Sequence, residues 1–322
     1  GADTLRGGDG NDTLMGGADG DSLIGGNGVA DSNGNDDVNG IADVVSYANY
    51  QGTASRTGLL IDLQNTANSS GDAKDDTYSG LEVLEGSGKD DTVVGGHATI
   101  RTLQGGGGDD VFKGLDLVYD TVVGGVGTDS IDLTAQPNAQ NGIDFELTSS
   151  QFASIEVVIG TTGNDTLDGS AYNGPLTLMG GEGAGNDVLK GGLADDTLVG
   201  GAGDDTLMGG GGTDVLRGGD GSDWADFSDR SAGLANLAIG VYDSVENVIG
   251  TAYDDTLVAK AGDEANAYWG GAEGLGGADG TDSLSYENAA SGVKASLATG
   301  GTLGDAQRLG CGAQPQPEPQ RA

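Results

Sequence analysis

The chain has 322 residues, of which 65 are glycine, and its 51 acidic residues against 13 basic ones give a formal net charge of −38. This charge repels nucleic acid and anionic membranes and favours cations as partners. A single cysteine, Cys311, excludes an internal disulfide, and no apolar run is long enough to span a bilayer.

A nine-residue template begins in the first residues and runs through most of the chain. Residues 7–15 read GGDGNDTLM, and variants of this stretch follow at 105–113, 124–132, 200–208 and 209–217. The template is Gly-Gly-x-Gly-x-Asp-x-U-x, in which U is apolar, and its positions are numbered 1 to 9. Glycine richness with one-sided charge is typical of disorder, but this strict periodicity argues against it. The first residue falls inside a repeat, so we expect the chain to be a piece of a longer protein.

Each nonapeptide predicts a tight turn followed by a short strand. Glycines at positions 1, 2 and 4 permit positive φ and close approach of neighbouring backbones. The last three residues form a minimal period-2 strand with one inward side chain. One such strand cannot bury its face alone, so the repeats must stack, two per coil, with Leu14 and Leu23 meeting across a thin interior.

Excursions of similar sequence separate the blocks of repeats. In residues 46–63 an aromatic residue and a glycine precede the apolar alternation Leu59-Ile61-Leu63, and residues 80–87 lead back into the template. Such alternation requires a buried face, so we interpret the excursions as longer strands of the same stack rather than as a ligand or partner surface. The aromatic residues expected to pack them are Tyr47, Phe227 and Tyr286.

The chain is thus predicted to form four blocks in one elongated rod rather than four globular domains. The boundaries are block 1 at 1–45, inter-block strands at 46–85, block 2 at 86–132, inter-block strands at 133–159, block 3 at 160–226, inter-block strands at 227–249, block 4 at 250–285, the start of further inter-block strands at 286–306, and a tail at 307–322. The tail abandons the pattern and is rich in proline. We expect it to be disordered, and our hypothesis for its origin is a reading-frame error or truncation.

The thin interior cannot hold this stack by burial alone. One apolar side chain per nonapeptide does not offset the conformational entropy lost by nine ordered residues. Stacking also brings the position-6 aspartates together, and their charges repel unless something positive lies between them. A hard divalent cation bound by carboxylate and carbonyl oxygens fits, and flexible oxygen-rich geometry favours Ca²⁺ over Mg²⁺. The alternative is a metal-free glycine-rich solenoid.

In these residues the chain resembles the repeats-in-toxin (RTX, hemolysin-type) calcium-binding nonapeptide repeat family. The resemblance implies an all-β fold, a right-handed parallel β-roll or β-solenoid, with several Ca²⁺ ions bound between coils on both edges. Carried over by position, it implies the aspartate ligands Asp3, Asp12, Asp21, Asp36, Asp91, Asp110, Asp120, Asp129, Asp165, Asp187, Asp196, Asp205, Asp214, Asp223, Asp255 and Asp282. It also implies carbonyl ligands from Gly8, Gly10, Gly106, Gly108, Gly125, Gly127, Gly201, Gly203, Gly210, Gly212, Gly219 and Gly221. Degenerate turns at 25–33, 95–104 and 169–179 are expected to lack complete coordination.

The sequence carries no motif of a known catalytic site. Its single histidine, His97, excludes a His-Glu-x-x-His zinc site, and neither a Gly-x-Ser-x-Gly elbow nor a phosphate-binding Gly-Lys-Ser/Thr occurs. Paired carboxylates are too numerous to single out an acid–base pair. We interpret His97 as a solvated residue and predict that the chain is not an enzyme by itself.

The resemblance further implies an extracellular or cell-surface location and the type I secretion machinery as a partner. We therefore predict a secreted calcium-binding module that folds when it meets Ca²⁺ outside the cell. Two other interpretations stay open. The chain could be the repeat region of a larger secreted enzyme or pore-forming toxin, or a spacer segment of a giant adhesin.

Overall fold

The computed structural model describes residues 1–8, 10–26, 42–51, 57–136, 139–230, 237–238, 244–251, 256–258, 268–269 and 283–285. Over these residues the fold is an all-β solenoid of parallel strands, as predicted, with three short 3₁₀ turns: η1 (Thr66–Asn68), η2 (Gly71–Ala73) and η3 (Ala139–Asn141). Asp36, Asp255, Asp282, Tyr286 and the tail at 307–322 lie outside the described residues.

The chain divides into two compact units. Unit 1 comprises residues 1–225 and 242–245, and unit 2 comprises residues 226–241 and 246–322. Within the described residues of unit 2, β23 (Leu237–Ala238), β25 (Thr256–Val258) and β27 (Ser283–Ser285) form one parallel sheet, and β24 (Asn247–Ile249) pairs with β26 (Tyr268–Trp269).

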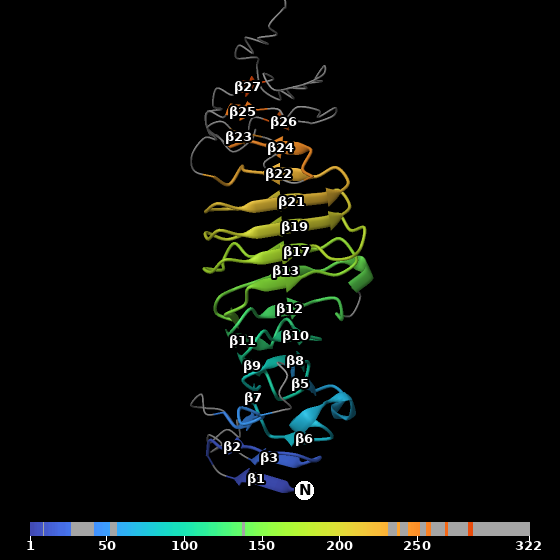
Figure 1. Ribbon diagram of the computed structural model, residues 1–322, viewed down its shortest axis with the longest axis vertical. Coiled ribbons are helices and arrows are strands. Elements are labelled where there is room, and N and C mark those ends of the chain that lie inside the picture. The colour runs from blue at the N-terminus through green and yellow to red at the C-terminus, as the bar shows by residue number, and fades with distance from the viewer. Residues whose placement is uncertain are drawn as a thin grey trace, which may run out of the picture. The chain divides into compact units, whose positions relative to one another are not determined.

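In the described part of unit 1, the strands form four parallel sheets and lie one above another along the unit (Figure 1). Sheet A consists of β1 (Thr4–Gly8), β3 (Ser22–Gly26) and β6 (Thr77–Ser79). Sheet B consists of β2 (Thr13–Leu14), β4 (Val44–Ser46), β7 (Val83–Glu85), β9 (Thr102–Gly107), β11 (Thr121–Val126) and β14 (Phe152–Ala153). Sheet C consists of β5 (Thr57–Asp62), β8 (Asp90–Val94), β10 (Val111–Lys113), β12 (Ser130–Asp132), β15 (Val157–Ile159), β17 (Thr177–Met179), β19 (Thr197–Ala202) and β21 (Val215–Asp220). Sheet D runs from β13 (Asp144–Glu146) through β16 (Thr166–Asp168), β18 (Val188–Lys190) and β20 (Thr206–Met208) to β22 (Trp224–Asp226).

Neighbouring coils stack with the template in register. Between β19 and β21, Leu198 pairs with Leu216 and Gly201 pairs with Gly219. The position-8 side chains therefore form continuous apolar columns, and Leu198 and Leu207 on opposite sheets are both fully buried. The predicted packing of the excursions is also confirmed, because Leu59, Ile61, Leu63, Tyr47 and Phe227 are all buried.

Each excursion within unit 1 replaces one sheet of the stack and keeps the other. Strands of block 1 alternate between sheets A and B, those of block 2 between B and C, and those of block 3 between C and D. After β4, the chain starts sheet C with β5, returns to finish sheet A with β6, and then continues sheet B with β7. Strands β13, β14 and β15 repeat this sequence at the next boundary.

The free edge of the new strand β5 is capped by side chains of its own excursion. Ser70 Oγ accepts the N–H of Leu60 at 2.9 Å, and Ser69 Oγ accepts the N–H of Asp62 at 2.9 Å. Hydroxyls thus take the place of a further strand, which blunts an edge that would otherwise offer unpaired backbone groups.

Candidate metal centre

The residue that precedes each strand occupies template position 6, and in most coils it is a buried aspartate. Its Oδ1 accepts the N–H of the position-6 residue in the coil before. Asp205 accepts from Asp187 at 2.7 Å, for example, and Asp223 accepts from Asp205 at 2.8 Å. These bonds form ladders of carboxylates along the edges of the stack. We call the place that template position 6 takes in each turn the slot of that turn.

Every described aspartate that the sequence pattern singled out lies at a ladder position, and all of them except Asp120 take part in these bonds. The Oδ1 of Asp120 accepts from the Arg101 side chain instead. Asp3 and Asp21 lie in the sheet A ladder, Asp12 and Asp120 in that of sheet B, Asp91, Asp110, Asp129, Asp196 and Asp214 in that of sheet C, and Asp165, Asp187, Asp205 and Asp223 in that of sheet D.

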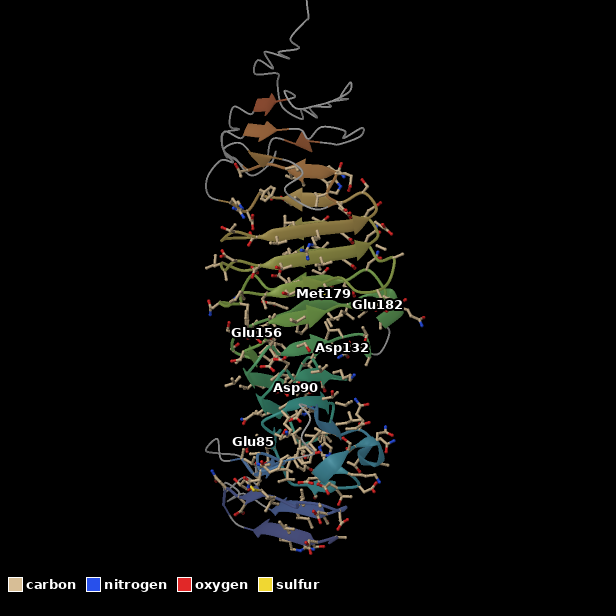
Figure 2. All side chains as sticks on the ribbon, viewed as in Figure 1. Glu85, Asp90, Asp132, Glu156, Met179 and Glu182 are labelled. Carbon is tan, nitrogen blue, oxygen red and sulfur yellow. The ribbon has the colours of Figure 1, made fainter. Side chains whose placement is uncertain are left out.

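Four carboxylates in the ladders were missed by the sequence pattern. Asp43 accepts the N–H of Asp12 and Asp76 accepts that of Asp21, each at 2.8 Å. Glu82 and Glu156 begin the returning strands and accept the N–H groups of Asp43 and Asp129 at 2.9 and 2.8 Å; Glu156 is labelled in Figure 2. A Glu-Val pair at each return was the signal in the sequence, but a longer side chain hid the equivalence with aspartate.

A second, exposed ladder runs beside the first at template position 5. Asp90, labelled in Figure 2, accepts the N–H of Asp109 at 3.0 Å, and Asp109 accepts that of Thr128 at 2.8 Å. Asn164, Asn186 and Asp204 continue the same arrangement in block 3. Asparagine serves as well as aspartate here, so this ladder requires a carbonyl-type oxygen rather than a charge.

The glycines of the template shape an oxygen-lined gap between coils. All the predicted ligand glycines have positive φ, for example Gly201 at +118° and Gly203 at +130°. Position-1 glycines meet a different requirement: a Cβ on Gly200 would overlap Asp205 Oδ2 and lie 2.7 Å from the carbonyl oxygen of Gly218 in the next coil. Only glycine leaves that space, so a carboxylate oxygen and a backbone carbonyl oxygen face the same small cradle.

In several turns this cradle holds a carboxylate oxygen that accepts no hydrogen bond. The buried Oδ2 atoms of Asp12, Asp21, Asp110, Asp129 and Asp205 have no donor. Buried polar oxygens without a partner are costly and rare in folded proteins. We call these turns open. In each of them the glycine at position 2 has positive φ.

Burial also shifts the pKa values of the ladder carboxylates. Burial, together with the neighbouring charges of Asp91 and Asp129, raises the pKa of Asp110 to about 8. The pKa values of Asp129 and Asp187 rise to about 6, again mainly through burial. Asp110 therefore requires either a proton or a cation near neutral pH.

The chemistry of the open turns fits Ca²⁺. Calcium takes six to eight oxygen ligands with flexible geometry, from carboxylates and backbone carbonyls together. No three His, Cys, Asp or Glu side chains within the described residues converge as a metal-binding group. The oxygens that these turns offer are instead a slot carboxylate together with backbone carbonyls. The aspartates and glycines named as ligands in the sequence analysis stay predictions.

Other ladder turns are closed by the chain itself. Asp91 Oδ2 accepts the N–H of Ser87 at 2.6 Å, and its Oδ1 accepts the Ser87 hydroxyl at 3.0 Å. Thr161 closes the turn of Asp165 in the same way, and the Gly192 N–H closes that of Asp196 at 2.7 Å. Ser87 and Thr161 stand at position 2 without positive φ, so their N–H groups point at the carboxylate.

Some slots contain no carboxylate at all. Leu176 fills the slot of the degenerate turn at 169–179, and Arg101 fills that of the turn at 95–104. At the last coil of sheet A, Asp76 is present but its Oδ2 accepts the Tyr47 hydroxyl at 2.7 Å.

His97 is half-buried rather than solvated, which corrects the prediction from sequence. Its Nδ1 accepts the N–H groups of Thr99 at 3.2 Å and Ile100 at 3.3 Å, and burial lowers its pKa. It caps the degenerate turn.

Among the residues that the structure describes, none forms a helix with the length and hydrophobicity of a membrane span.

Comparison with known families agrees with this geometry. The family model of the RTX calcium-binding nonapeptide repeat (4 copies) matches residues 1–29, 102–116, 153–173, 177–207 and 190–225. No curated protein matches the chain. The matched segments include the open turns of Asp12, Asp21, Asp110 and Asp205. The chain therefore carries the repeats of the RTX calcium-binding nonapeptide family, on a parallel β-solenoid.

Proposed function

We propose that this chain is a secreted, non-catalytic calcium-binding module whose folding is coupled to Ca²⁺. The observation that carries the proposal is the set of buried Oδ2 atoms in the open turns, which accept no hydrogen bond and most of which share their cradle with a backbone carbonyl oxygen. The predicted ligand residues would hold several ions, one between successive coils wherever two neighbouring turns provide a complete oxygen set.

The coupling follows from the balance of charge and burial. Without a cation, folding buries many carboxylates whose mutual repulsion and lost hydration oppose the stacking of coils. Binding Ca²⁺ neutralises these charges, and because the unfolded chain has no preformed site, the free energy of binding becomes free energy of folding. Extracellular modules of this kind bind Ca²⁺ at roughly 10⁻⁴–10⁻³ M. The chain would stay unfolded in a cytosol poor in free Ca²⁺ and fold outside the cell, which suits the extracellular or cell-surface location and type I export proposed for it.

Circular dichroism of the chain in chelator and in millimolar Ca²⁺ tests the proposal. We expect weak strand signal in chelator, a strong signal after addition of Ca²⁺, and loss of that signal when chelator is restored. Mg²⁺ at equal concentration is the matched control and should restore far less signal, because it requires a rigid octahedral set and gives up water reluctantly. An equal strand signal with and without Ca²⁺ would refute coupled folding.

A further inference from the structure

Arg101 occupies an aspartate slot in the sheet B ladder. Its carbonyl accepts the N–H of Thr121 at 2.7 Å, as the carbonyls of the aspartate slots do for the next strand. Its N–H donates back to the Glu82 carbonyl at 2.9 Å rather than forward to a carboxylate, as the N–H of Glu156 does to the Asp129 carbonyl. Arg101 therefore stands in the stack where other coils have an aspartate, while the charge of the side chain is reversed.

The guanidinium group contacts the carboxylates of the next turn. Arg101 Nη1 lies 3.1 Å from Asp116 Oδ2 and 3.2 Å from Asp120 Oδ1. The Asp120 side chain is 1 % exposed, whereas Arg101 and Asp116 are about one-third exposed. The Arg101 guanidinium also lies 5.2 Å from the centre of the Tyr119 ring, which holds the cation over an aromatic face.

The remaining oxygen of Asp120 is also satisfied by the chain. Its Oδ2 accepts the N–H of Asp116 at 2.8 Å and that of Gly96 at 3.3 Å. Both carboxylate oxygens of this buried aspartate thus have donors, one of them positively charged. The Oδ2 of Asp110, in the sheet C ladder of the same block, has none.

The turn that leads to Asp120 also lacks the oxygen-lined cradle. Its residues 114–119 read GLDLVY, so leucine, aspartate and valine stand where the template has glycines at positions 1, 2 and 4. Asp116 at position 2 does not have positive φ, in contrast to Gly106 at +105° in the open turn of Asp110. At this coil, both the backbone geometry of the turn and the charge of the slot residue therefore differ from those of the open turns.

We propose that Arg101 is a built-in cation that takes the place of Ca²⁺ at Asp120. This inference rests on the proposed function, because it specifies which ladder position does without metal. It removes Asp120 from the predicted ligands and makes the sheet B edge of block 2 independent of calcium, while the sheet C edge of that block keeps its open turns at Asp110 and Asp129. Two neighbouring coils of block 2 are then joined at this edge by an ion pair at any calcium concentration.

Counting bound Ca²⁺ on the full chain tests the proposal. Equilibrium dialysis with elemental analysis gives the number of ions, and circular dichroism in saturating Ca²⁺ confirms that each variant is folded. Asp120→Asn should leave the number unchanged, whereas the matched variant Asp110→Asn should lower it by at least one. Arg101→Gln leaves the carboxylates of Asp116 and Asp120 without their cation, so a folded variant in saturating Ca²⁺ should unfold at lower urea than the unmodified chain. Arg101→Lys keeps the charge and should lose much less of that resistance, and neither variant should change the number of bound ions.

Two results would overturn the proposal. One is a loss of Ca²⁺ from a folded Asp120→Asn variant as large as that from Asp110→Asn. The other is a folded Arg101→Gln variant that resists urea as well as the unmodified chain. Failure of the proposed function would be recognised separately, because the unmodified chain would then bind no Ca²⁺ at all.

Discussion

A buried carboxylate can oppose or support this fold, and the group beside its second oxygen decides which. Asp91 and Asp165 are held by the hydroxyl and N–H of Ser87 and Thr161, whereas the Oδ2 atoms of Asp110 and Asp205 face backbone carbonyls without a donor. The same residue type thus provides a satisfied hydrogen-bond acceptor in one coil and a cation ligand in another. The difference is set at position 2, where serine and threonine avoid the positive φ that glycine adopts.

The raised pKa values of three buried ladder aspartates predict an unusual pH dependence in chelator. Burial raises the pKa of Asp110 to about 8 and those of Asp129 and Asp187 to about 6, above the ordinary value of 3.8. The metal-free folded chain therefore binds more protons than the unfolded chain between about pH 4 and 8, so its free energy of unfolding should fall as pH rises through this range. We expect more strand signal at pH 5 than at pH 8 when Ca²⁺ is absent.

Two measurements give this prediction its controls. Asp110→Asn removes the most shifted group and should flatten the upper part of the pH profile. In saturating Ca²⁺ the trend should reverse, because protons compete with the cation for the same oxygens. Strand signal in chelator that grows with pH would contradict the prediction.

At the scale of one repeat, the turn and its strand depend on glycine for two separate reasons. Position 2 needs positive φ, as at Gly106, and position 1 needs space for an aspartate oxygen and a carbonyl from the next coil, as at Gly200. Position 3 has neither requirement, which explains why the sequence varies there while the glycines around it recur.

Alanine substitutions within a single turn separate these effects. A Cβ on Gly106 would overlap the Ser87 carbonyl at a φ of +105°, so Gly106→Ala should cost more than about 1 kcal/mol of unfolding free energy and weaken Ca²⁺ binding. A Cβ on Gly107, the next residue, would meet no atom closer than 3.9 Å, and Gly107→Ala should change stability by less than about 0.5 kcal/mol. Urea unfolding in saturating Ca²⁺ compares them, and equal losses would contradict this account of the turn.

The sequence predicted the repeat unit well and the irregular coils poorly. Apolar residues at position 8 marked the interior correctly, because a two-residue alternation is enough to orient a side chain such as Leu198. Asp43 and Asp76 were missed because their turns do not match the template, and they join the ladders through strand pairing. The role of Arg101 could not be read from the sequence either, since it depends on a contact with a turn in the following coil.

At the scale of unit 1, sheets rather than blocks are the continuous structures. Sheet B belongs to blocks 1 and 2, and sheet C to blocks 2 and 3, so no boundary between blocks separates two independent interiors. The predicted division into blocks describes the sequence period, while its boundaries mark exchanges of one sheet.

Because neighbouring blocks share a sheet, a substitution that destabilises one block should also destabilise the next. Val122 is fully buried in β11 of sheet B, and Val122→Ala should cost about 1–3 kcal/mol. Amide hydrogen exchange should then rise in β4 and β7, the sheet B strands that precede block 2, as well as in β9 within block 2. Val126 in the same strand is 78 % exposed, so Val126→Ala is the matched control and should leave exchange unchanged. Exchange that rises only within residues 86–132 would show that the blocks open independently.

The placement of β5 also limits the route by which the chain can assemble. β5 precedes β6 and β7 in the chain, yet its backbone partner is β8, while β6 completes the older sheet. A polypeptide that emerges N-terminus first cannot extend the stack one coil at a time across this junction, because β5 has no partner until Asp90–Val94 has appeared. Growth should therefore pause at each junction and resume in one step once the excursion and the first repeat after it are both available.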